Sequence, residues 1–191
     1  MFDNCLDDLI KKHNTEIEER LNAQLNTNVT PHDLLAIEAI KEALKASRNH
    51  NYPVGALIVD NDYQILARNH NHVFDPYFNS MGHAEMTTLN EFESKYPEIG
   101  YKGIRLITSI EPCIMCYSRL ILSKIDTIEF IADDPRHGAV EFSKHFPKSY
   151  NVFQQPHVFS RFTCAAEISH IASDLFFKHP LWDTEIYQTH K

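Results

Sequence analysis

The residues best suited to chemistry lie in two short motifs, His83-Ala84-Glu85 and Pro112-Cys113-Ile114-Met115-Cys116. Cys113 and Cys116 are three positions apart, so on a helix they share one face. Pro112 suits the first turn of that helix, where the helix dipole favours thiolate over thiol. Two thiolates and one imidazole balance the charge of Zn²⁺ and leave the fourth tetrahedral position open. The pattern predicts one zinc ion per chain, bound by His83, Cys113 and Cys116 as in a catalytic site.

Glu85 is the residue expected to move protons at this site. It follows His83 by two positions, and at the first turn of a helix both side chains can point into one cleft. A carboxylate near a metal-activated water can accept a proton and pass it on, because the anionic neighbour raises its pKa. The sequence therefore assigns Glu85 the catalytic acid/base role.

These motifs must be positioned by secondary structure, which hydrophobic periodicity outlines. Apolar residues at helical spacing predict helices over about 32–47, 83–96, 111–123 and 163–178. Apolar or β-branched runs predict strands over about 54–59, 63–69, 104–110 and 126–132, with a further short strand near Tyr150–Phe153. Strands and helices alternate after the first hairpin. The expected fold is α/β: a three-layer α/β/α sandwich whose mixed central sheet of about five strands has helices on both faces.

The first residues of the chain form a segment of their own. Residues 1–31 are polar with a helix-like apolar pattern, and the run from Asn26 to Pro31 reads as a break. We therefore expect an N-terminal helical extension over residues 1–31 and a single domain over residues 32–191.

The motifs resemble those of the cytidine deaminase superfamily, in which H-x-E is followed by P-C-x-x-C. The matching segments are Pro53–Ala56, His83–Met86 and Glu111–Cys116, and a looser match runs over Asp133–Ala139. Within the superfamily the chain is similar to the branch that contains tRNA adenosine deaminases, guanine deaminases and cytosine deaminases. The resemblance covers about residues 32–178.

The resemblance implies a function and further site residues. It implies a zinc-dependent hydrolytic deaminase, which replaces an amino group of a nucleobase, nucleoside or nucleotide with a carbonyl and releases ammonia. It also implies that Asn71 and the backbone N–H of Ala84 contact the substrate, and that the protein forms a homodimer. The chain departs from relatives in the spacing between Asp75-Pro76 and His83 and in the bulky residues Tyr117-Ser118-Arg119. Both departures bear on substrate specificity.

Composition limits the kind of partner. The 191 residues carry a formal net charge of −8, which disfavours broad binding to nucleic acids or anionic membranes. We therefore expect a small-molecule nucleobase or nucleoside as the substrate, with tRNA as the alternative. No apolar run approaches the roughly 20 residues that span a bilayer, and the acidic start of the chain has no signal-peptide core. A cytoplasmic protein without membrane contacts is expected.

Other interpretations of the motifs explain fewer residues. A redox Cys-x-x-Cys pair leaves His83 and Glu85 without a role. A structural zinc site usually has four protein ligands and no adjacent carboxylate. A non-catalytic partner subunit that keeps the fold would not need Glu85.

Overall fold

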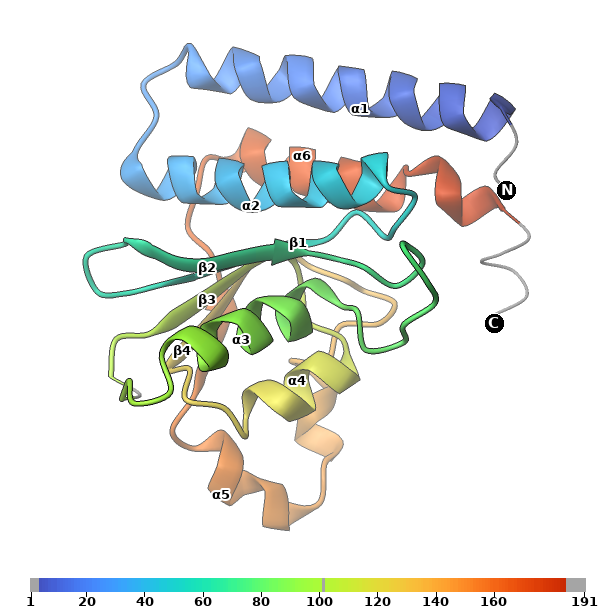
Figure 1. The fold of residues 1–191 in the computed structure, drawn as a ribbon. Coiled ribbons are helices and arrows are strands. Elements are labelled where there is room, and N and C mark those ends of the chain that lie inside the picture. The colour runs from blue at the N-terminus through green and yellow to red at the C-terminus, as the bar shows by residue number, and fades with distance from the viewer. Residues whose placement is uncertain (1–3, 101, 185–191) are drawn as a thin grey trace.

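The computed structural model of the chain describes residues 4–100 and 102–184 (Figure 1). Its α-helices are α1 (Asn4–Leu25), α2 (Pro31–Arg48), α3 (Ala84–Lys95), α4 (Ile114–Leu120), α5 (Asn151–Gln154) and α6 (Ala166–Phe177). Its strands are β1 (Gly55–Val59), β2 (Ile65–His70), β3 (Arg105–Ile110), β4 (Thr127–Ala132) and β5 (Val158–Arg161). Short 3₁₀ helices are η1 (Phe142–His145), η2 (Lys148–Tyr150) and η3 (Pro180–Asp183).

The described strands form one mixed sheet in the order β2-β1-β3-β4-β5. β1 is antiparallel to both β2 and β3, whereas β3, β4 and β5 run parallel to one another. Because a parallel connection needs a crossover, α4 lies between β3 and β4. The ends of β3 and β4 therefore face the same edge of the sheet, where the residues that follow each strand meet.

Helices cover both faces of the sheet, α2 and α6 on one face and α3 and α4 on the other (Figure 1). Successive side chains of a strand point to opposite faces of the sheet. They therefore pack into two separate hydrophobic cores, one on each face. Leu57 and Val59 pack with α2 and α6, while Ile58 packs with α3 and α4. The expected three-layer α/β/α sandwich is confirmed.

The expected strand near Tyr150–Phe153 is wrong. These residues lie in η2 and α5, and the fifth strand is β5, a few residues later. Aromatic and β-branched residues favour strands, which is why Tyr150–Phe153 resembled one. β5 is instead a sheet-edge strand whose four residues are all exposed or half-buried, so it lacks an apolar alternation. Because β5 lies at the edge of the sheet, its sequence lacks the apolar pattern from which a strand is predicted.

α1 lies outside α2 and α6 and adds a further layer to that side of the molecule (Figure 1). Its own side chains Ile10, Ile17 and Leu21 are buried. Arg20 forms ion pairs with Glu167 at 2.7 Å and Asp174 at 2.8 Å, both on α6. α1 falls within the segment expected as a helical extension, and residues 185–191 of the expected 32–191 domain lie outside the described residues. No helix among the described residues is both long and apolar enough to cross a membrane.

A buried hydrogen-bond chain ties the C-terminal segment to α1 and α2. His179 precedes η3 and accepts a hydrogen bond from the Leu181 N–H at Nδ1, at 3.2 Å. Its Nε2 therefore carries the proton and donates to Ser47 Oγ at 2.6 Å. Ser47 in turn donates to Asn14 Oδ1 at 2.7 Å. These hydrogen bonds require a neutral imidazole. Burial keeps His179 neutral, because it lowers the pKa of His179 to about 3.

With His179→Gln, the free energy of unfolding is expected to fall less steeply as the pH is lowered below neutrality. A histidine in the unfolded chain has a pKa near 6.5. Between about pH 6 and pH 4 the unfolded chain therefore binds a proton at this position, whereas His179 of the folded protein stays neutral. The free energy of unfolding of the wild type should therefore fall by an additional ~1.4 kcal/mol for each pH unit that the solution is acidified. Glutamine keeps one donor and one acceptor but does not titrate.

The measurement is urea unfolding of both proteins at several pH values between 7 and 4. Carboxylates contribute equally to both proteins, so the difference between the two profiles isolates His179. Parallel profiles would contradict this assignment of a neutral histidine.

Candidate active site

His83, Cys113 and Cys116 are brought together by the N-terminal ends of two helices. His83 is the residue before α3, and Cys113 is the residue before α4. Both have extended backbone conformations, with ψ of 149° and 170°. Cys116 lies in the first turn of α4 and is fully buried. Helix N-termini carry partial positive charge, which favours a thiolate at Cys113.

The distances between the three side chains fit a tetrahedral zinc site. His83 Nδ1 lies 3.5 Å from Cys113 Sγ and 3.6 Å from Cys116 Sγ. Zinc–sulfur and zinc–nitrogen bonds at a tetrahedral angle place N and S about 3.6 Å apart. All three ligand atoms lie within 4.8 Å of one another. The donor set therefore matches zinc in chemistry and in spacing, with one coordination position left for a non-protein ligand.

Glu85 lies in the first turn of α3, beside the cysteines. Its side chain is buried, 5% exposed. Burial, followed by the neighbouring charge of Cys113, raises the pKa of Glu85 to about 7. A hydrogen bond from the Cys116 thiol lowers the pKa of Cys113 to about 4, despite burial. The site thus combines a cysteine that is readily deprotonated, Cys113, with a carboxyl group, Glu85, that can exchange a proton near neutral pH.

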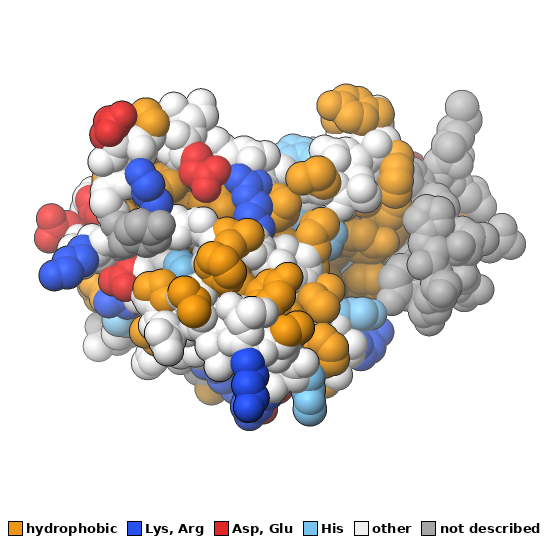
Figure 2. Space-filling model, turned by 90° about the horizontal axis from the view of Figure 1, so that it is seen from below, with side chains coloured by type: hydrophobic (Ala, Val, Ile, Leu, Met, Phe, Trp, Pro, Cys, Tyr) orange, Lys and Arg blue, Asp and Glu red, His pale blue; other side chains and the backbone are white. Residues whose placement is uncertain are grey.

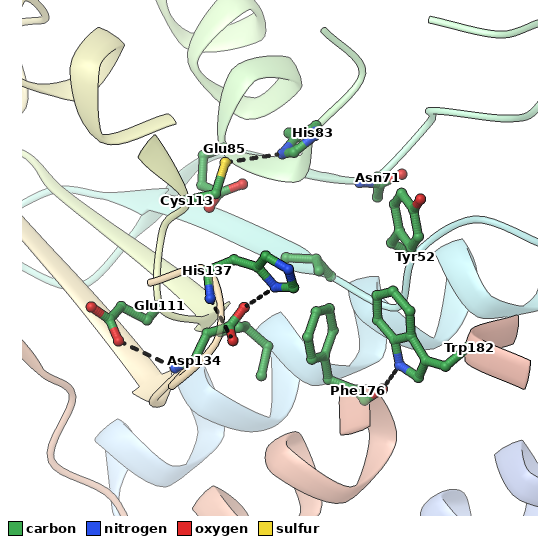
Figure 3. A pocket seen from close by; sticks show the side chains of 12 residues that line it. Tyr52, Asn71, His83, Glu85, Glu111, Cys113, Asp134, His137, Phe176 and Trp182 are labelled. Carbon is green, nitrogen blue, oxygen red and sulfur yellow. Dashed lines mark hydrogen bonds and ion pairs between the residues drawn. The ribbon is translucent and has the colours of Figure 1, made fainter. Parts of the chain in front are cut away.

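These groups line a cavity of about 280 Å³ (Figure 3). Asn71, after the end of β2, shares its wall with His83 and Glu85. Three aromatic side chains, Tyr52, Phe176 and Trp182, line the part of the cavity away from Glu85 and Cys113, with Tyr52 next to Asn71 (Figure 3). Tyr52 and Trp182 are stacked with ring centroids 5.2 Å apart and an interplanar angle of 17°. The cavity therefore combines the group of possible zinc ligands and Glu85 with flat aromatic surfaces and further polar side chains.

The loop after β4 closes another side of the cavity. Glu111 accepts hydrogen bonds from the backbone N–H groups of Asp134 and Val140, at 3.2 and 3.0 Å, and it points away from the cavity centre (Figure 3). Gly138 packs against Glu111 so closely that a Cβ there would lie 2.3 Å from the carboxylate. Glu111 therefore holds this loop in place, with Asp134 and His137 in the cavity lining.

Most of the sequence-predicted site residues meet in this cavity. His83, Glu85, Cys113 and Asn71 all line it, and the Cys116 sulfur lies within 4.8 Å of the ligand atoms of His83 and Cys113. Ala84 is fully buried at the start of α3 and does not belong to the lining formed by the described residues.

Sequence reasoning missed part of the lining. It gave Tyr52, Glu111, Asp134, His137, Phe176 and Trp182 no individual role in the cavity. Glu111 and the Asp133–Ala139 segment carried a signal, since both belong to the motifs that resemble the superfamily. Tyr52 carried none beyond its position just before Pro53.

Comparison with known proteins shows to which family a chain with this arrangement of residues is similar. The sequence model of the family described as "Cytidine and deoxycytidylate deaminase zinc-binding region" matches residues 30–132. A tRNA-specific adenosine deaminase of Rickettsia bellii is 31% identical over 142 residues, which are 74% of this chain and 96% of that protein. A tRNA-specific adenosine deaminase of Bacillus subtilis is 36% identical over 110 residues, 58% of this chain and 67% of that protein.

Solved structures share the fold. A structure described in studies of tRNA:A34 deaminases superposes with a TM-score of 0.57 at 24% identity, covering 72% of this chain and 94% of that chain. The guanine deaminase of Nitrosomonas europaea gives a TM-score of 0.58 at 16% identity, covering 78% and 86%. The fold, the spacing of His83, Cys113 and Cys116 and the match over residues 30–132 lead to one conclusion: the chain belongs to the cytidine and deoxycytidylate deaminase zinc-binding family.

Proposed function

We propose that the protein is a hydrolytic deaminase that converts adenosine in tRNA to inosine and releases ammonia. The observation that carries the proposal is one cavity that brings the zinc-ligand set, Glu85 and Asn71 together with the stacked rings of Tyr52 and Trp182. The choice of adenosine in tRNA is supported by the relative from Rickettsia bellii, a tRNA-specific adenosine deaminase that the chain covers almost completely.

The residues of the chain divide the chemistry between them. A zinc ion bound by His83, Cys113 and Cys116 would supply a hydroxide nucleophile by lowering the pKa of a water molecule. The Glu85 carboxylate takes up the proton released there, delivers it to a ring nitrogen and then assists the departure of ammonia. Its burial keeps bulk water away, so the proton passes between the reacting groups.

Asn71 and Ala84 hold the substrate in this proposal. Asn71 accepts a hydrogen bond from the Val73 N–H at 3.0 Å, which fixes its amide and leaves the NH₂ group for the substrate. The first backbone N–H groups of α3, including that of Ala84, have no partner within the helix and can donate to the ring.

Asn71→Ala should raise KM for the substrate by about tenfold, the effect of one lost polar contact. An unchanged KM would remove Asn71 from the binding site.

A free nucleobase or nucleoside is the second candidate substrate, and the composition of the cavity favours it. No lysine or arginine is among the described residues that line the cavity, whereas Glu85, Glu111 and Asp134 are. Together with the net charge of −8, this lining suits an uncharged ring better than a phosphate. The same zinc chemistry serves both substrates.

The experiment that separates the candidates is ammonia release by zinc-loaded protein. The substrates are tRNA, adenosine, adenine, guanine, cytosine and cytidine, and Glu85→Gln protein is the blank. Inosine formation in tRNA alone would support the first proposal. Turnover of a small molecule without tRNA turnover would replace it with the second. The absence of all turnover at full zinc occupancy would contradict both.

A second copy of the chain is the proposed partner. Viewed from the side of α4 and α5, the surface carries hydrophobic side chains next to one another (Figure 2). In these elements and the adjoining segments, the exposed large hydrophobic residues are Ile114, Leu122, Phe142, Tyr150, Val152, Phe153 and Val158. Exposed apolar surface of this kind is typical of protein interfaces. Sedimentation equilibrium should give twice the 22.2 kDa mass of the chain, and a monomer at micromolar concentration would contradict the proposal.

A further inference from the structure

A second hollow lies beside the active-site cavity. It has a volume of about 420 Å³ and is formed by the loop after β4, the end of β5 and one side of α6. Its polar lining residues are Asp133, Arg136, Arg161, Ser169, His170 and Ser173.

The hollow and the active-site cavity share a wall. Asp134 and His137 of the loop after β4 line the cavity, while Asp133 and Arg136 of the same loop line the hollow. The Arg136 guanidinium carbon lies 5.5 Å from the ring centroid of Trp182, which belongs to the cavity wall. A ligand group in the hollow would therefore lie one side chain away from a base in the cavity.

Arg136 differs from every other arginine of the chain. The other six arginines each have a carboxylate within 4.0 Å: Arg20, Arg48, Arg68, Arg105, Arg119 and Arg161. Among the described residues no carboxylate lies within that distance of Arg136, which stacks on Phe177 at 4.8 Å instead. In an acidic chain, an exposed arginine without a carboxylate partner retains its full attraction for an anion.

Arg161 brings a second guanidinium group to the hollow. Its Nε lies 3.3 Å from Asp133, and its NH2 group donates to Ser169 Oγ at 3.3 Å. Both members of the ion pair are more than half exposed, so solvent weakens their attraction. The hollow thus holds two guanidinium groups against one exposed carboxylate.

We propose that the hollow lined by Arg136 and Arg161 binds a phosphate group of the substrate while the base occupies the cavity. The proposal rests on the proposed deaminase function. Guanidinium groups match phosphate oxygens with paired donors, and the Ser173 hydroxyl in the same lining can add a further donor, whereas Ser169 already donates to the Ile131 carbonyl. Because no lysine or arginine is among the described residues of the cavity lining, a phosphate of the substrate is held outside the cavity. The phosphate can belong to an RNA backbone or to a nucleotide.

The first test uses inorganic phosphate and does not depend on turnover. Nitrogen-15-labelled arginine protein is titrated with phosphate at constant ionic strength, and the Nε–H signals are assigned with the variants Arg136→Gln, Arg161→Gln and Arg68→Gln. The signals of Arg136 and Arg161 should shift and saturate, while that of Arg68 stays in place. No saturable shift, or an equal shift at Arg68, would overturn the proposal.

The second test measures deamination kinetics. On tRNA, each of Arg136→Gln and Arg161→Gln should raise KM about fivefold, the effect of one exposed ion pair. Each should also reduce the slope of log KM against log salt concentration by about one. kcat should stay unchanged, because neither arginine touches the reacting ring. Arg68→Gln removes an exposed, carboxylate-paired arginine from β2 and serves as the matched control.

Two further substrates identify the source of the phosphate. If the variants raise KM for tRNA, the phosphate belongs to an RNA backbone. If they raise KM only for adenosine 5′-monophosphate, and not for adenosine, it belongs to a nucleotide. Unchanged KM for both phosphate-bearing substrates would overturn the proposal. If neither tRNA nor adenosine reacts, the proposed function fails, whereas the phosphate titration still decides whether the hollow binds phosphate.

Discussion

Replacing Glu85 with glutamine is expected to lower kcat by about 10³- to 10⁴-fold, the contribution of a well-placed general acid and base. Glutamine has the same shape and fills the same buried position at the start of α3. It cannot accept the proton released from water or return one to the ring. KM should change little, because the base is held by other groups.

Two controls separate this effect from a change in the fold or the metal site. Glu93→Gln alters the exposed side of the same helix, where Glu93 pairs with Arg119, and it should leave kcat at the wild-type level. The zinc content of Glu85→Gln protein, measured by atomic absorption, should equal that of the wild type, because Glu85 is not one of the three grouped ligands. If Glu85→Gln kept more than a tenth of the wild-type kcat, another group would be the proton carrier.

The grouping of His83, Cys113 and Cys116 was predictable because their placement depends on local structure. Cys113 and Cys116 are set by the first turn of one helix, and His83 and Glu85 by the first turn of another. The central strands were also predictable, because strands buried by helices on both faces are rich in apolar residues: β1 is a continuous apolar run, and β3 contains Leu106, Ile107 and Ile110. The half-exposed edge strand β5 carries no such run, and its prediction failed.

The rest of the cavity depends on contacts between distant parts of the chain. Tyr52 and Trp182 stack although 130 positions separate them, and no periodicity in the sequence pairs them. α4 begins only at Ile114, three residues later than predicted, and the extended Cys113 bridges to Gly138 in the loop after β4. Such contacts arise from tertiary packing, and they decide the shape of the pocket and hence its specificity.

Cys116→Ala is expected to abolish zinc binding and turnover while the fold persists. Cys116 belongs to the group of three side chains that could hold the ion among the described residues, so its loss leaves His83 and Cys113, too few to retain zinc against a chelator. Turnover should fall at least as far as in Glu85→Gln, because the source of the nucleophile is lost. The hydrophobic clusters on the two faces of the sheet do not include Cys116, so both cores remain.

Thermal unfolding with and without a chelator tests this linkage directly. A ligand that binds only the folded state stabilises it by about 4 kcal/mol at a thousand times its Kd. Chelation should therefore lower the Tm of the wild type and leave that of Cys116→Ala unchanged. Cys164→Ala is the matched control: Cys164 is half-buried against the α2 and α6 core, outside the ligand group, and this variant should respond to chelation as the wild type does. A Tm of Cys116→Ala that still falls on chelation would show that zinc binds elsewhere, and the ligand assignment would then be wrong.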